Sequence, residues 1–432
     1  MRRTSLPVRF RLPSIALFLM LAGTSGAAAQ GGPSPEQVLR NMDTDGDGRI
    51  SRQEWRGPPP RFDQIDANRD SYITLEELRA GRAGAPAATE GAARAAGGQA
   101  PSAAACDNPA ARLDAEIWID TQVHLRPGPN AAFAPALQRG IERMDAARIV
   151  AAVVMPQPFP DDDSGGRAVY DSADFAPAAR RLPCRYAFLG GNALNQMLAA
   201  TRPDAVTPEL RERFRREAEA VLAQGAAGFG QIALLHMSRF AGHPFQEVAP
   251  DHPLMLLLAE IAGAAGKVIN VHMQVYERDG APPSSWRGQN PARIQANVAG
   301  FERLLAHDRR ARITLANFGE DPSGQFTLAL ARRLLSAHSN LFLIVTIPPA
   351  RENSGLSPFA AFGGLRPDWL QLVADFPDRF TIGSLSFFAA AERARGPDPS
   401  DIGRTRSLIA ALPADLRRKL AIDTPQALYG LR

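Results

Sequence analysis

Lysine is almost missing from this chain, because only Lys267 and Lys419 stand among its 49 basic side chains. The arginines that replace it form no stripe interleaved with aromatic side chains, the arrangement that grips a nucleic-acid strand. Apart from the four arginines among the first eleven residues, 45 basic side chains balance 45 acidic ones. A chain with so little excess positive charge is not expected to bind nucleic acid.

Long apolar runs are scarce as well. The run from Ile15 to Leu21 is too short to span a bilayer, and no later segment resembles a transmembrane helix. It follows a basic start and precedes three alanines at positions 27–29, which is the order of a secretory signal with its cleavage site. We therefore predict that residues 1–29 are a signal peptide. The mature chain is then exported, to the periplasm or the medium, and has no transmembrane segment.

Cysteine occurs only twice, as Cys106 and Cys184. An exported protein can keep a disulfide because its surroundings are oxidising. A disulfide also needs the two Cα atoms within about 7 Å of each other, which a sequence does not reveal. A disulfide and two unpaired thiols are therefore both open.

Large apolar residues are nearly absent between Ala80 and Ala105, where Ala, Gly and Pro dominate. A segment of this composition cannot bury enough apolar surface to fold alone. We predict a flexible linker at 81–105, which separates a small domain at 30–80 from a large one at 106–432. The length of 432 residues is sufficient for both.

Two twelve-residue loops in the small domain repeat one pattern. The first runs from Asp43 to Glu54 and the second from Asp66 to Glu77, each with oxygen-bearing side chains at positions 1, 3, 5, 9 and 12 and isoleucine at position 8. Calcium is a hard cation that needs many oxygen ligands in one shell, and this spacing folds them around one point. The pattern is that of the EF-hand. Its tandem occurrence predicts a small all-α EF-hand pair with a short strand pairing between the loops.

The prediction is therefore two Ca²⁺ sites, each with side-chain ligands and one backbone carbonyl at position 7. The predicted ligands are Asp43, Asp45, Asp47, Arg49 and Glu54 in site one, and Asp66, Asn68, Asp70, Tyr72 and Glu77 in site two. Site two has one carboxylate fewer, and Ser71 replaces the glycine of position 6. A left-handed backbone costs a serine more than a glycine, so we expect weaker binding there.

The first residues of the two loops are only 23 positions apart, and the sequence at 57–60, Gly-Pro-Pro-Pro, ends the first exit helix early. This compact spacing resembles the EF-hand pairs of exported bacterial proteins and implies a structural role more than a sensing one. In calcium-rich surroundings a dissociation constant of roughly 10⁻⁴ to 10⁻³ M keeps such sites occupied. The alternative is a pair of solvated acidic loops that bind nothing.

The large domain alternates short apolar runs with helical patterns. The eight predicted strands are 117–122, 149–155, 185–191, 228–234, 268–273, 312–317, 341–347 and 379–384. Cap and stop residues predict helices at 207–223 and 254–265, and a third that Asn290 opens and that reaches about Ala306. Eight strands with helices between them, in about 320 residues, indicate an α/β fold of the (β/α)₈ TIM-like barrel type. A doubly wound open sheet is the alternative.

The motifs at the strand ends resemble those of the amidohydrolase-related superfamily, in particular the group that includes decarboxylases of aromatic acids. They are Ile119-Asp120-Thr121-Gln122-Val123-His124, Met144-Asp145-Ala146-Ala147-Arg148-Ile149, Gly228-Phe229-Gly230-Gln231, Asn270-Val271-His272-Met273, Ala316-Asn317-Phe318-Gly319 and Ile382-Gly383-Ser384-Leu385. The tail at 422–430 resembles the closing helix of the same family.

The resemblance implies a metal at the C-terminal mouth of the barrel. Its ligands would be a His-x-His pair on strand one, histidines on strands five and six, and an aspartate on strand eight. This chain keeps His124 and His272. Gln122 replaces the other histidine of the pair, Asn317 replaces the sixth-strand histidine, and Leu385 replaces the aspartate. Gln231 stands where relatives often have an acidic residue.

Two imidazoles are fewer than the three protein ligands of a catalytic zinc, and Leu385 cannot accept a proton from metal-bound water. We therefore predict that the barrel has lost its metal and its catalysis. The polar side chains at the mouth then either bind a small polar molecule or satisfy one another. Two alternatives stay open: an active hydrolase or decarboxylase with a rearranged metal site, and a scaffold for an unknown protein partner.

The remaining candidates fit ordinary roles. His236, His243 and His252 follow the fourth strand at spacings that match no metal motif, so we expect them at the surface or in a lid. Glu320 and Asp321 follow the sixth strand and could supply replacement carboxylates to the barrel.

Overall fold

The structure is a computed structural model, and the chain divides in it into two compact units, Met1–Gly97 and Gly98–Arg432. The boundary falls within the predicted linker, which lies outside the described residues together with the predicted signal peptide. None of the described helices is long and apolar enough to cross a membrane. The described residues are 35–44, 49–52, 54–57, 62, 65–66, 72–75, 77–78, 116–127, 133–159, 170–239, 244–347, 354–360, 363–389 and 402–431.

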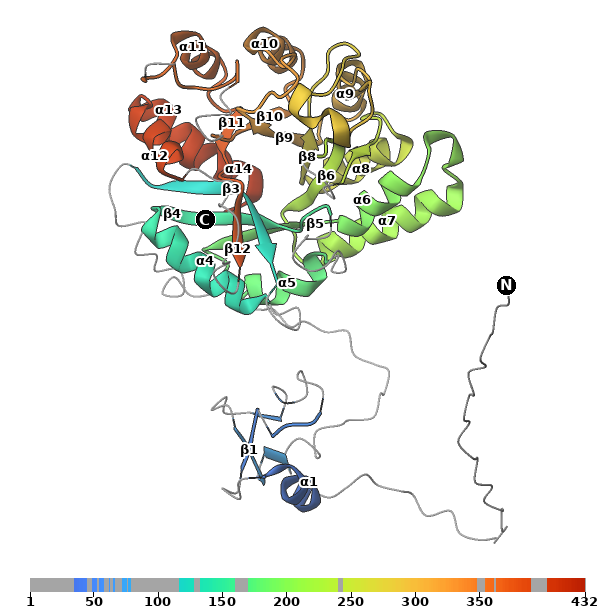
Figure 1. Ribbon diagram of the computed structural model, residues 1–432, viewed down its shortest axis with the longest axis vertical. Coiled ribbons are helices and arrows are strands. Elements are labelled where there is room, and N and C mark those ends of the chain that lie inside the picture. The colour runs from blue at the N-terminus through green and yellow to red at the C-terminus, as the bar shows by residue number, and fades with distance from the viewer. Residues whose placement is uncertain are drawn as a thin grey trace, which may run out of the picture. The chain divides into compact units, whose positions relative to one another are not determined.

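The small unit contains helix α1 (Pro35–Met42) and a two-stranded antiparallel sheet of β1 (Arg49–Ser51) and β2 (Tyr72–Thr74) (Figure 1). Ile50 is paired with Ile73 in this sheet, and both side chains are fully buried. They occupy position 8 of the two loops, so the predicted strand pairing between the loops is confirmed.

The core of this unit is small and mostly aliphatic and aromatic. Ile50 and Ile73 pack with Phe62 and Leu78, and Trp55 meets Phe62 edge to face with ring centroids 5.8 Å apart. Residues 54–57 form no helix after the first loop, which agrees with the predicted early end of that helix. The two loops are therefore joined chiefly through their strands and this core.

The large unit is a ring of parallel strands with helices outside it (Figure 1). The strands in the order of the chain are β3 (Trp118–Arg126), β4 (Ile149–Met155), β5 (Tyr186–Gly190), β6 (Gly228–His236), β8 (Val268–Met273), β9 (Arg312–Phe318), β10 (Leu341–Val345), β11 (Phe380–Ile382) and β12 (Ser386–Ala389). Hydrogen bonds join them in the order β11-β10-β9-β8-β6-β5-β4-β3-β12, and β7 (Gln246–Glu247) pairs antiparallel with the end of β6. Every predicted strand is present, with ends that shift by a few residues.

The two strands at the ends of that order, β11 and β12, are consecutive in sequence. Between them the Gly383 amide donates to the Val345 carbonyl at 3.0 Å, and the Leu385 amide donates to the Gln122 carbonyl at 3.0 Å. β11 and β12 are thus halves of one eighth strand, which pairs first with β10 and then with β3. This closes the sheet into a TIM-like barrel and rules out the open-sheet alternative.

Helices cover the outside of the barrel; those up to α11 lie between successive strands, and α12 and α13 follow the last strand. They are α4 (Ala134–Ala146), α5 (Ser172–Ala179), α6 (Asn192–Ala200), α7 (Pro208–Ala223), α8 (Pro253–Ala265), α9 (Val298–His307), α10 (Leu328–Ala337), α11 (Pro367–Asp375), α12 (Ile402–Ala411) and α13 (Ala414–Arg418). Thr207 caps α7 by accepting from the Leu210 amide at 3.2 Å, and Gly266 ends α8 with φ of 63°. Both helix ends are as predicted.

The third predicted helix is wrong in its first half, because α9 begins at Val298 and not after Asn290. The Asn290 amide donates to the carbonyls of Ser238 and Trp286 at 2.8 Å each, and its oxygen accepts from the Ser238 amide at 2.8 Å. The side chain expected to cap a helix therefore fastens a loop to a 3₁₀ turn at Ser284–Gln289.

The C-terminal helix α14 (Thr424–Tyr429) closes the end of the barrel where the strands begin. Leu428, Tyr429 and Leu431 pack against Ile119 and Val268, which lie at the starts of β3 and β8. Burial raises the pKa of the Tyr429 hydroxyl well above its usual range. The opposite end, where the strands finish, is left for the polar residues of the candidate site.

Candidate functional site

The position-12 glutamates of the two EF-hand loops accept hydrogen bonds from equivalent residues. One carboxylate oxygen of Glu54 accepts from the amide and the hydroxyl of Ser51 at 2.8 Å each, and Glu77 accepts from the amide and the hydroxyl of Thr74 at 2.9 Å each. Ser51 and Thr74 both occupy position 9. Each loop thus uses position 9 to orient its final carboxylate.

The first loop adds a second pair of donors. The other oxygen of Glu54 accepts from the amide and the hydroxyl of Thr44, at 2.7 and 3.0 Å. These hydrogen bonds, those from Ser51 first, lower the pKa of Glu54 to about 2, so the group is an anion at any ordinary pH. Among the predicted calcium ligands, Asp43, Arg49, Glu54, Asp66, Tyr72 and Glu77 are described, whereas Asp45, Asp47, Asn68 and Asp70 lie outside the described residues.

In the barrel, three of the predicted pocket residues, on the strands β3, β9 and β8, form a hydrogen-bonded chain across the barrel. The amide of Gln122 on β3 contacts that of Asn317 on β9 at 2.9 Å, and the other end of the Asn317 amide contacts His272 Nδ1 at 3.3 Å. The chain continues from His272 Nε2 to the amide nitrogen of Gln274 at 3.1 Å. Sequence reasoning did not identify Gln274, which follows β8 directly.

His124 lies on β3, two residues beyond Gln122, and its side chain is buried. Its ring lies 5.3 Å from the Phe387 ring, centroid to centroid. Burial lowers its pKa to about 4. The carbonyls of Met155 and Pro156 favour the protonated ring and so raise the pKa, but their effect is smaller. His124 is therefore a neutral imidazole at physiological pH.

Several buried polar atoms of the predicted pocket residues have no hydrogen-bond partner among the described residues. They belong to Gln122 (Oε1), His124 (Nδ1) and Gln231 (Nε2), and all three side chains are at least 95% buried. An unsatisfied buried polar atom costs on the order of 1–3 kcal/mol, so such atoms point to a water or a ligand. The predicted pocket is thus only partly satisfied by its own members.

The base of this pocket is tied to the eighth strand. The buried carboxylate of Asp120 accepts from the backbone N–H of Ser384 at 2.9 Å and from the backbone N–H of Gln122 at 3.2 Å. It also accepts from the Ser384 hydroxyl. A Cβ added at Gly383 would lie 2.7 Å from Gln122 Cβ, so only glycine lets strand eight pass so close to Gln122. These contacts fix where Gln122 points.

Asn317 and Leu385 have a left-handed backbone, with φ of 63° and 59°. They stand where the family resemblance implies a histidine and an aspartate. Asparagine tolerates this conformation, whereas for leucine it is strained by about 1–2 kcal/mol. Strain of this kind is concentrated at functional sites, and here it remains at a position whose side chain is aliphatic.

The side chains present do not fit a catalytic transition metal. Both ring nitrogens of His272 face amide groups, Leu385 has no donor atom, and amides are poor ligands for zinc. No group of three or more His, Cys, Asp or Glu side chains in the described part of the chain could hold a metal ion. The metal centre that the resemblance implies has no complete ligand set there.

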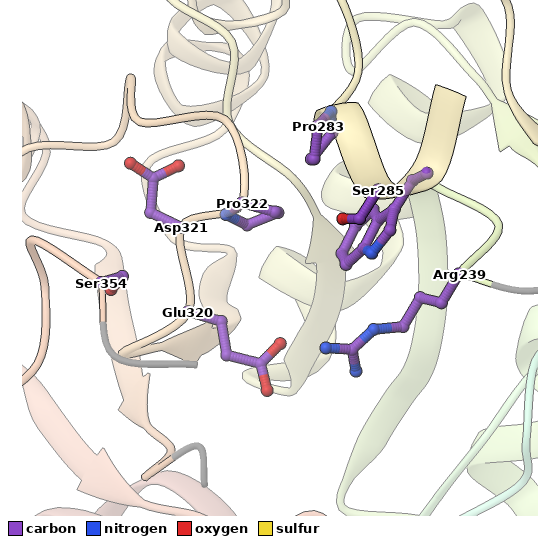
Figure 2. A pocket seen from close by; sticks show the side chains of 8 residues that line it. Arg239, Pro283, Ser285, Glu320, Asp321, Pro322 and Ser354 are labelled. Atoms are coloured by element: carbon purple, nitrogen blue, oxygen red, sulfur yellow. The ribbon is translucent and has the colours of Figure 1, made fainter. Parts of the chain in front are cut away.

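A cavity of about 500 Å³ lies at the mouth of the barrel, in the loops after β6, β8, β9 and β10. In Figure 2 the carboxylate of Glu320 and the guanidinium of Arg239 point toward one another across it. Arg239 also lies over the Trp286 ring, 5.1 Å from its centroid. Asp321 instead accepts from the Ser323 hydroxyl at 2.7 Å and from the Phe326 amide at 3.0 Å, so it holds its own loop.

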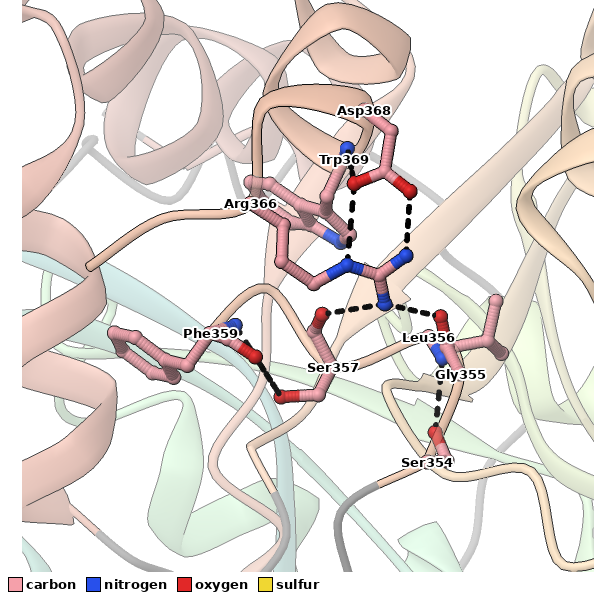
Figure 3. A network of polar contacts seen from close by, with 8 residues as sticks. All are labelled: Ser354, Gly355, Leu356, Ser357, Phe359, Arg366, Asp368 and Trp369. Carbon is pink, nitrogen blue, oxygen red and sulfur yellow. Dashed lines mark hydrogen bonds and ion pairs between the residues drawn. The ribbon is translucent and has the colours of Figure 1, made fainter. Parts of the chain in front are cut away.

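The loop after β10 supplies Ser354 to this cavity and is fastened from α11 (Figure 3). Arg366 makes a two-pronged contact with Asp368, at 3.1 and 2.5 Å, and donates to the carbonyls of Gly355 and Ser357 at 2.5 and 3.3 Å. Ser354 in turn donates to the Gly319 carbonyl at 2.7 Å. These contacts hold the described part of this loop, from Ser354 onward, in place.

Two histidines differ from the expectation of a surface or lid position. The His236 ring lies 5.1 Å from that of His272 and 4.4 Å from that of Phe159, because β6 extends two residues further than predicted. His252 is buried and caps α8, accepting from the Leu254 amide at 3.1 Å. His243 lies outside the described residues. Cys184 is disulfide-bonded, and Cys106, the only other cysteine of the sequence, also lies outside them.

Comparison with known proteins supports the reading of the small unit. Residues 36–57 and 61–81 match the family model described as EF hand. A transaldolase of Thermosynechococcus vestitus is 46% identical over 46 residues, which cover 11% of this chain and 12% of that protein. The chain thus matches about an eighth of the length of this curated relative, and the likeness concerns a short segment of both.

Several solved structures are similar to the large unit at low identity. A 2,6-dihydroxybenzoate decarboxylase from Rhizobium is 13% identical with a TM-score of 0.40, over 73% of this chain and 99% of that one. An amidohydrolase 2 from Bifidobacterium longum subsp. infantis is 11% identical with a TM-score of 0.38, over 73% and 99%. A dihydroxybenzoic acid decarboxylase from Polaromonas with bound manganese is 12% identical with a TM-score of 0.40, over 73% and 97%. These structures carry names of the family that the strand-end motifs resemble; the closed parallel strand order is what establishes the barrel.

Proposed function

We propose that this chain is an exported calcium-binding protein whose barrel holds a small polar molecule and performs no metal-assisted catalysis. The calcium part rests above all on the pairing of Ile50 with Ile73, which joins two loops of matching ligand pattern. In both loops the position-12 carboxylate accepts from the residue at position 9, Ser51 in the first loop and Thr74 in the second. Two loops built alike at their described ends support two calcium sites.

The two sites differ in charge. Site one offers four carboxylates and site two offers three with one amide, so site one binds more tightly. We expect dissociation constants of roughly 10⁻⁴ to 10⁻³ M, the range of extracellular modules. At such affinities the ions hold the module together in calcium-rich surroundings.

Calorimetric titration of the mature chain, residues 30–432, tests this part. We expect two binding events, with the stronger lost in Glu54→Gln and the weaker lost in Glu77→Gln. Glu219→Gln on the exposed face of α7 is the matched control and leaves both events unchanged. A wild-type titration without heat, repeated with the same result by equilibrium dialysis, would remove the proposal. N-terminal sequencing of the exported protein, which we expect to start at Gln30, tests the location.

The barrel part rests on the buried polar atoms of Gln122, His124 and Gln231 that have no partner among the described residues. A neutral set of amides and an imidazole suits an uncharged polar guest better than an ion, because no ligand set compensates a buried charge there. Mass spectrometry of small molecules released by denaturing the purified protein should detect such a guest.

A second candidate function, a hydrolase or decarboxylase with a rearranged metal site, is favoured by the retention of His124 on β3 and His272 on β8. Elemental analysis after a calcium-selective wash separates the two candidates. Stoichiometric zinc or manganese that disappears in His272→Gln would favour the enzyme, and its absence would favour the binding protein.

A further inference from the structure

The hydrogen bonds around His272 determine which of its ring nitrogens carries the proton. This follows because the orientation of the Gln274 side-chain amide is known. The oxygen of Gln274 accepts from the backbone amide of Met237 at 3.2 Å. Its nitrogen is therefore the end that lies 3.1 Å from His272 Nε2. An amide nitrogen can only donate, so His272 Nε2 accepts a hydrogen bond.

A neutral imidazole that accepts at one nitrogen carries its proton on the other. The proton of His272 is thus on Nδ1, 3.3 Å from the amide of Asn317. An N–H group needs an oxygen opposite it, so Asn317 must turn its oxygen to His272 and its nitrogen to Gln122. Exchanging the ends of an amide leaves its heavy atoms almost where they are.

The same reasoning carries one step further along the chain. If the nitrogen of Asn317 faces Gln122 across the 2.9 Å contact, Gln122 must present its oxygen there. The buried end of Gln122 without a partner among the described residues is then its NH₂ group. The buried amide of Gln231 also has an end without such a partner, and because either end of an amide can be turned there, Gln231 can donate as well.

His124 offers the opposite polarity. The carbonyls of Met155 and Pro156 accept from its ring and so raise its pKa, although burial outweighs them. Its Nδ1 has no partner among the described residues, so the nitrogen that donates to those carbonyls is Nε2. Nδ1 is therefore a lone pair that can accept a hydrogen bond from a guest.

Building on the proposed ligand site in the barrel, we infer that His272 is held as its Nδ1–H tautomer and thereby makes Gln122 a donor toward the interior. The guest then presents an acceptor oxygen to the NH₂ groups of Gln122 and Gln231 and a hydroxyl to His124. The class that fits is a small uncharged hydroxy-carbonyl compound. A carboxylate in the same place would lose its hydration to neutral groups, which is costly.

The tautomer is tested by NMR of the mature protein labelled with ¹⁵N-histidine, with His272→Gln to assign the signal. We expect His272 Nδ1 to show the shift of a protonated nitrogen and Nε2 that of an unprotonated one. The reverse pattern would overturn the inference while leaving the proposed ligand site intact, so the two failures are distinguishable.

The ligand class is tested with hydroxyacetone, glycolate and acetone as probes, followed by the ring ¹⁵N signals of His124 and His272. We expect saturable shifts with hydroxyacetone and at least tenfold weaker binding of glycolate, which replaces the ketone by a carboxylate, and of acetone, which lacks the hydroxyl. Preference for glycolate, or no shift with any probe, would overturn the assignment of this class.

Gln122→Glu removes the donor and should weaken hydroxyacetone binding at least tenfold, whereas Gln295→Glu on the exposed surface should not. The ring signals of His252, the buried cap of α8, report whether each variant is folded. Gln122→Met serves as the second variant if Gln122→Glu does not fold. Undiminished binding in a folded variant would contradict the role of Gln122.

Discussion

At the scale of single residues, His124 makes the stability of the barrel depend on pH. Its pKa is about 4 in the folded protein and near 6.5 when exposed, so the unfolded chain binds more protons between these values. Stability from this group is fully present above about pH 6.5, falls on acidification toward pH 4 and then levels off. The total loss is on the order of 3 kcal/mol.

Urea unfolding at pH 7.5 and at pH 4.5 checks this prediction in wild type and in His124→Gln. Between pH 7.5 and pH 4.5 the free energy of unfolding should fall by roughly 2–3 kcal/mol less in the variant than in wild type. This difference does not depend on how stable the variant is at neutral pH. Equal pH dependence of the two proteins would show that His124 is not the buried neutral group described here.

Leu385 carries a different strain, because its φ is 59°. A folded protein is normally more stable with alanine than with glycine at a given position. At a position with positive φ the Cβ of alanine is strained, and the order of stability is reversed. We expect Leu385→Gly to be more stable than Leu385→Ala by about 1 kcal/mol. Thermal unfolding of the two variants side by side measures the difference, and a more stable alanine variant would contradict the strain.

At the scale of elements, the pairing of β1 with β2 couples the two calcium loops. Ile73 is fully buried against Ile50 and Phe62 in the core of the small unit. Ile73→Ala should cost about 2–4 kcal/mol of module stability and weaken calcium binding in both loops, although the ligands of site one are unchanged. Val38→Ala on α1, at the margin of this core, is the milder control.

Calcium titration of Ile73→Ala, with separate fits for the two sites, tests whether binding is weakened in both loops. Weakening confined to site two would mean that the loops act independently and that the strand pairing does not transmit the loss.

The elements also show what the sequence could predict. Each apolar run became a strand because a parallel barrel buries both faces of its strands, and the EF-hand loops follow from local spacing alone. The split of strand eight into β11 and β12 depends on which strands lie beside it, and no local pattern encodes that. Asn290 failed as a cap because Ser238, 52 residues away, competes for its side chain.

The sequence predicted which residues form the candidate site, but not the hydrogen bonds between them. The family resemblance of the strand-end motifs identified Gln122, His272 and Asn317, whereas their hydrogen bonds to one another and to Gln274 depend on tertiary packing. His236 was missed because the fourth strand was ended at Leu234. Had the strand been extended to include the polar residue that follows the apolar run, His236 would have been counted at the mouth.

At the scale of the whole molecule, the composition of the predicted linker bears on how the two units respond to calcium. Residues 81–105 have almost no large apolar side chains to pack on either unit. We therefore expect calcium to stabilise the small unit without stabilising the barrel. A ligand at 100 times its dissociation constant adds about 2.7 kcal/mol to the state that binds it.

Scanning calorimetry of the mature chain with and without saturating calcium tests this separation. One transition should move to higher temperature and the other should stay in place, and Glu54→Gln combined with Glu77→Gln should abolish the shift. The His252 ring signals give an independent marker of the barrel transition. If calcium moved both transitions together in wild type and neither in the double variant, the units would be energetically coupled, and the ions would then act on the barrel as well as on the module that binds them.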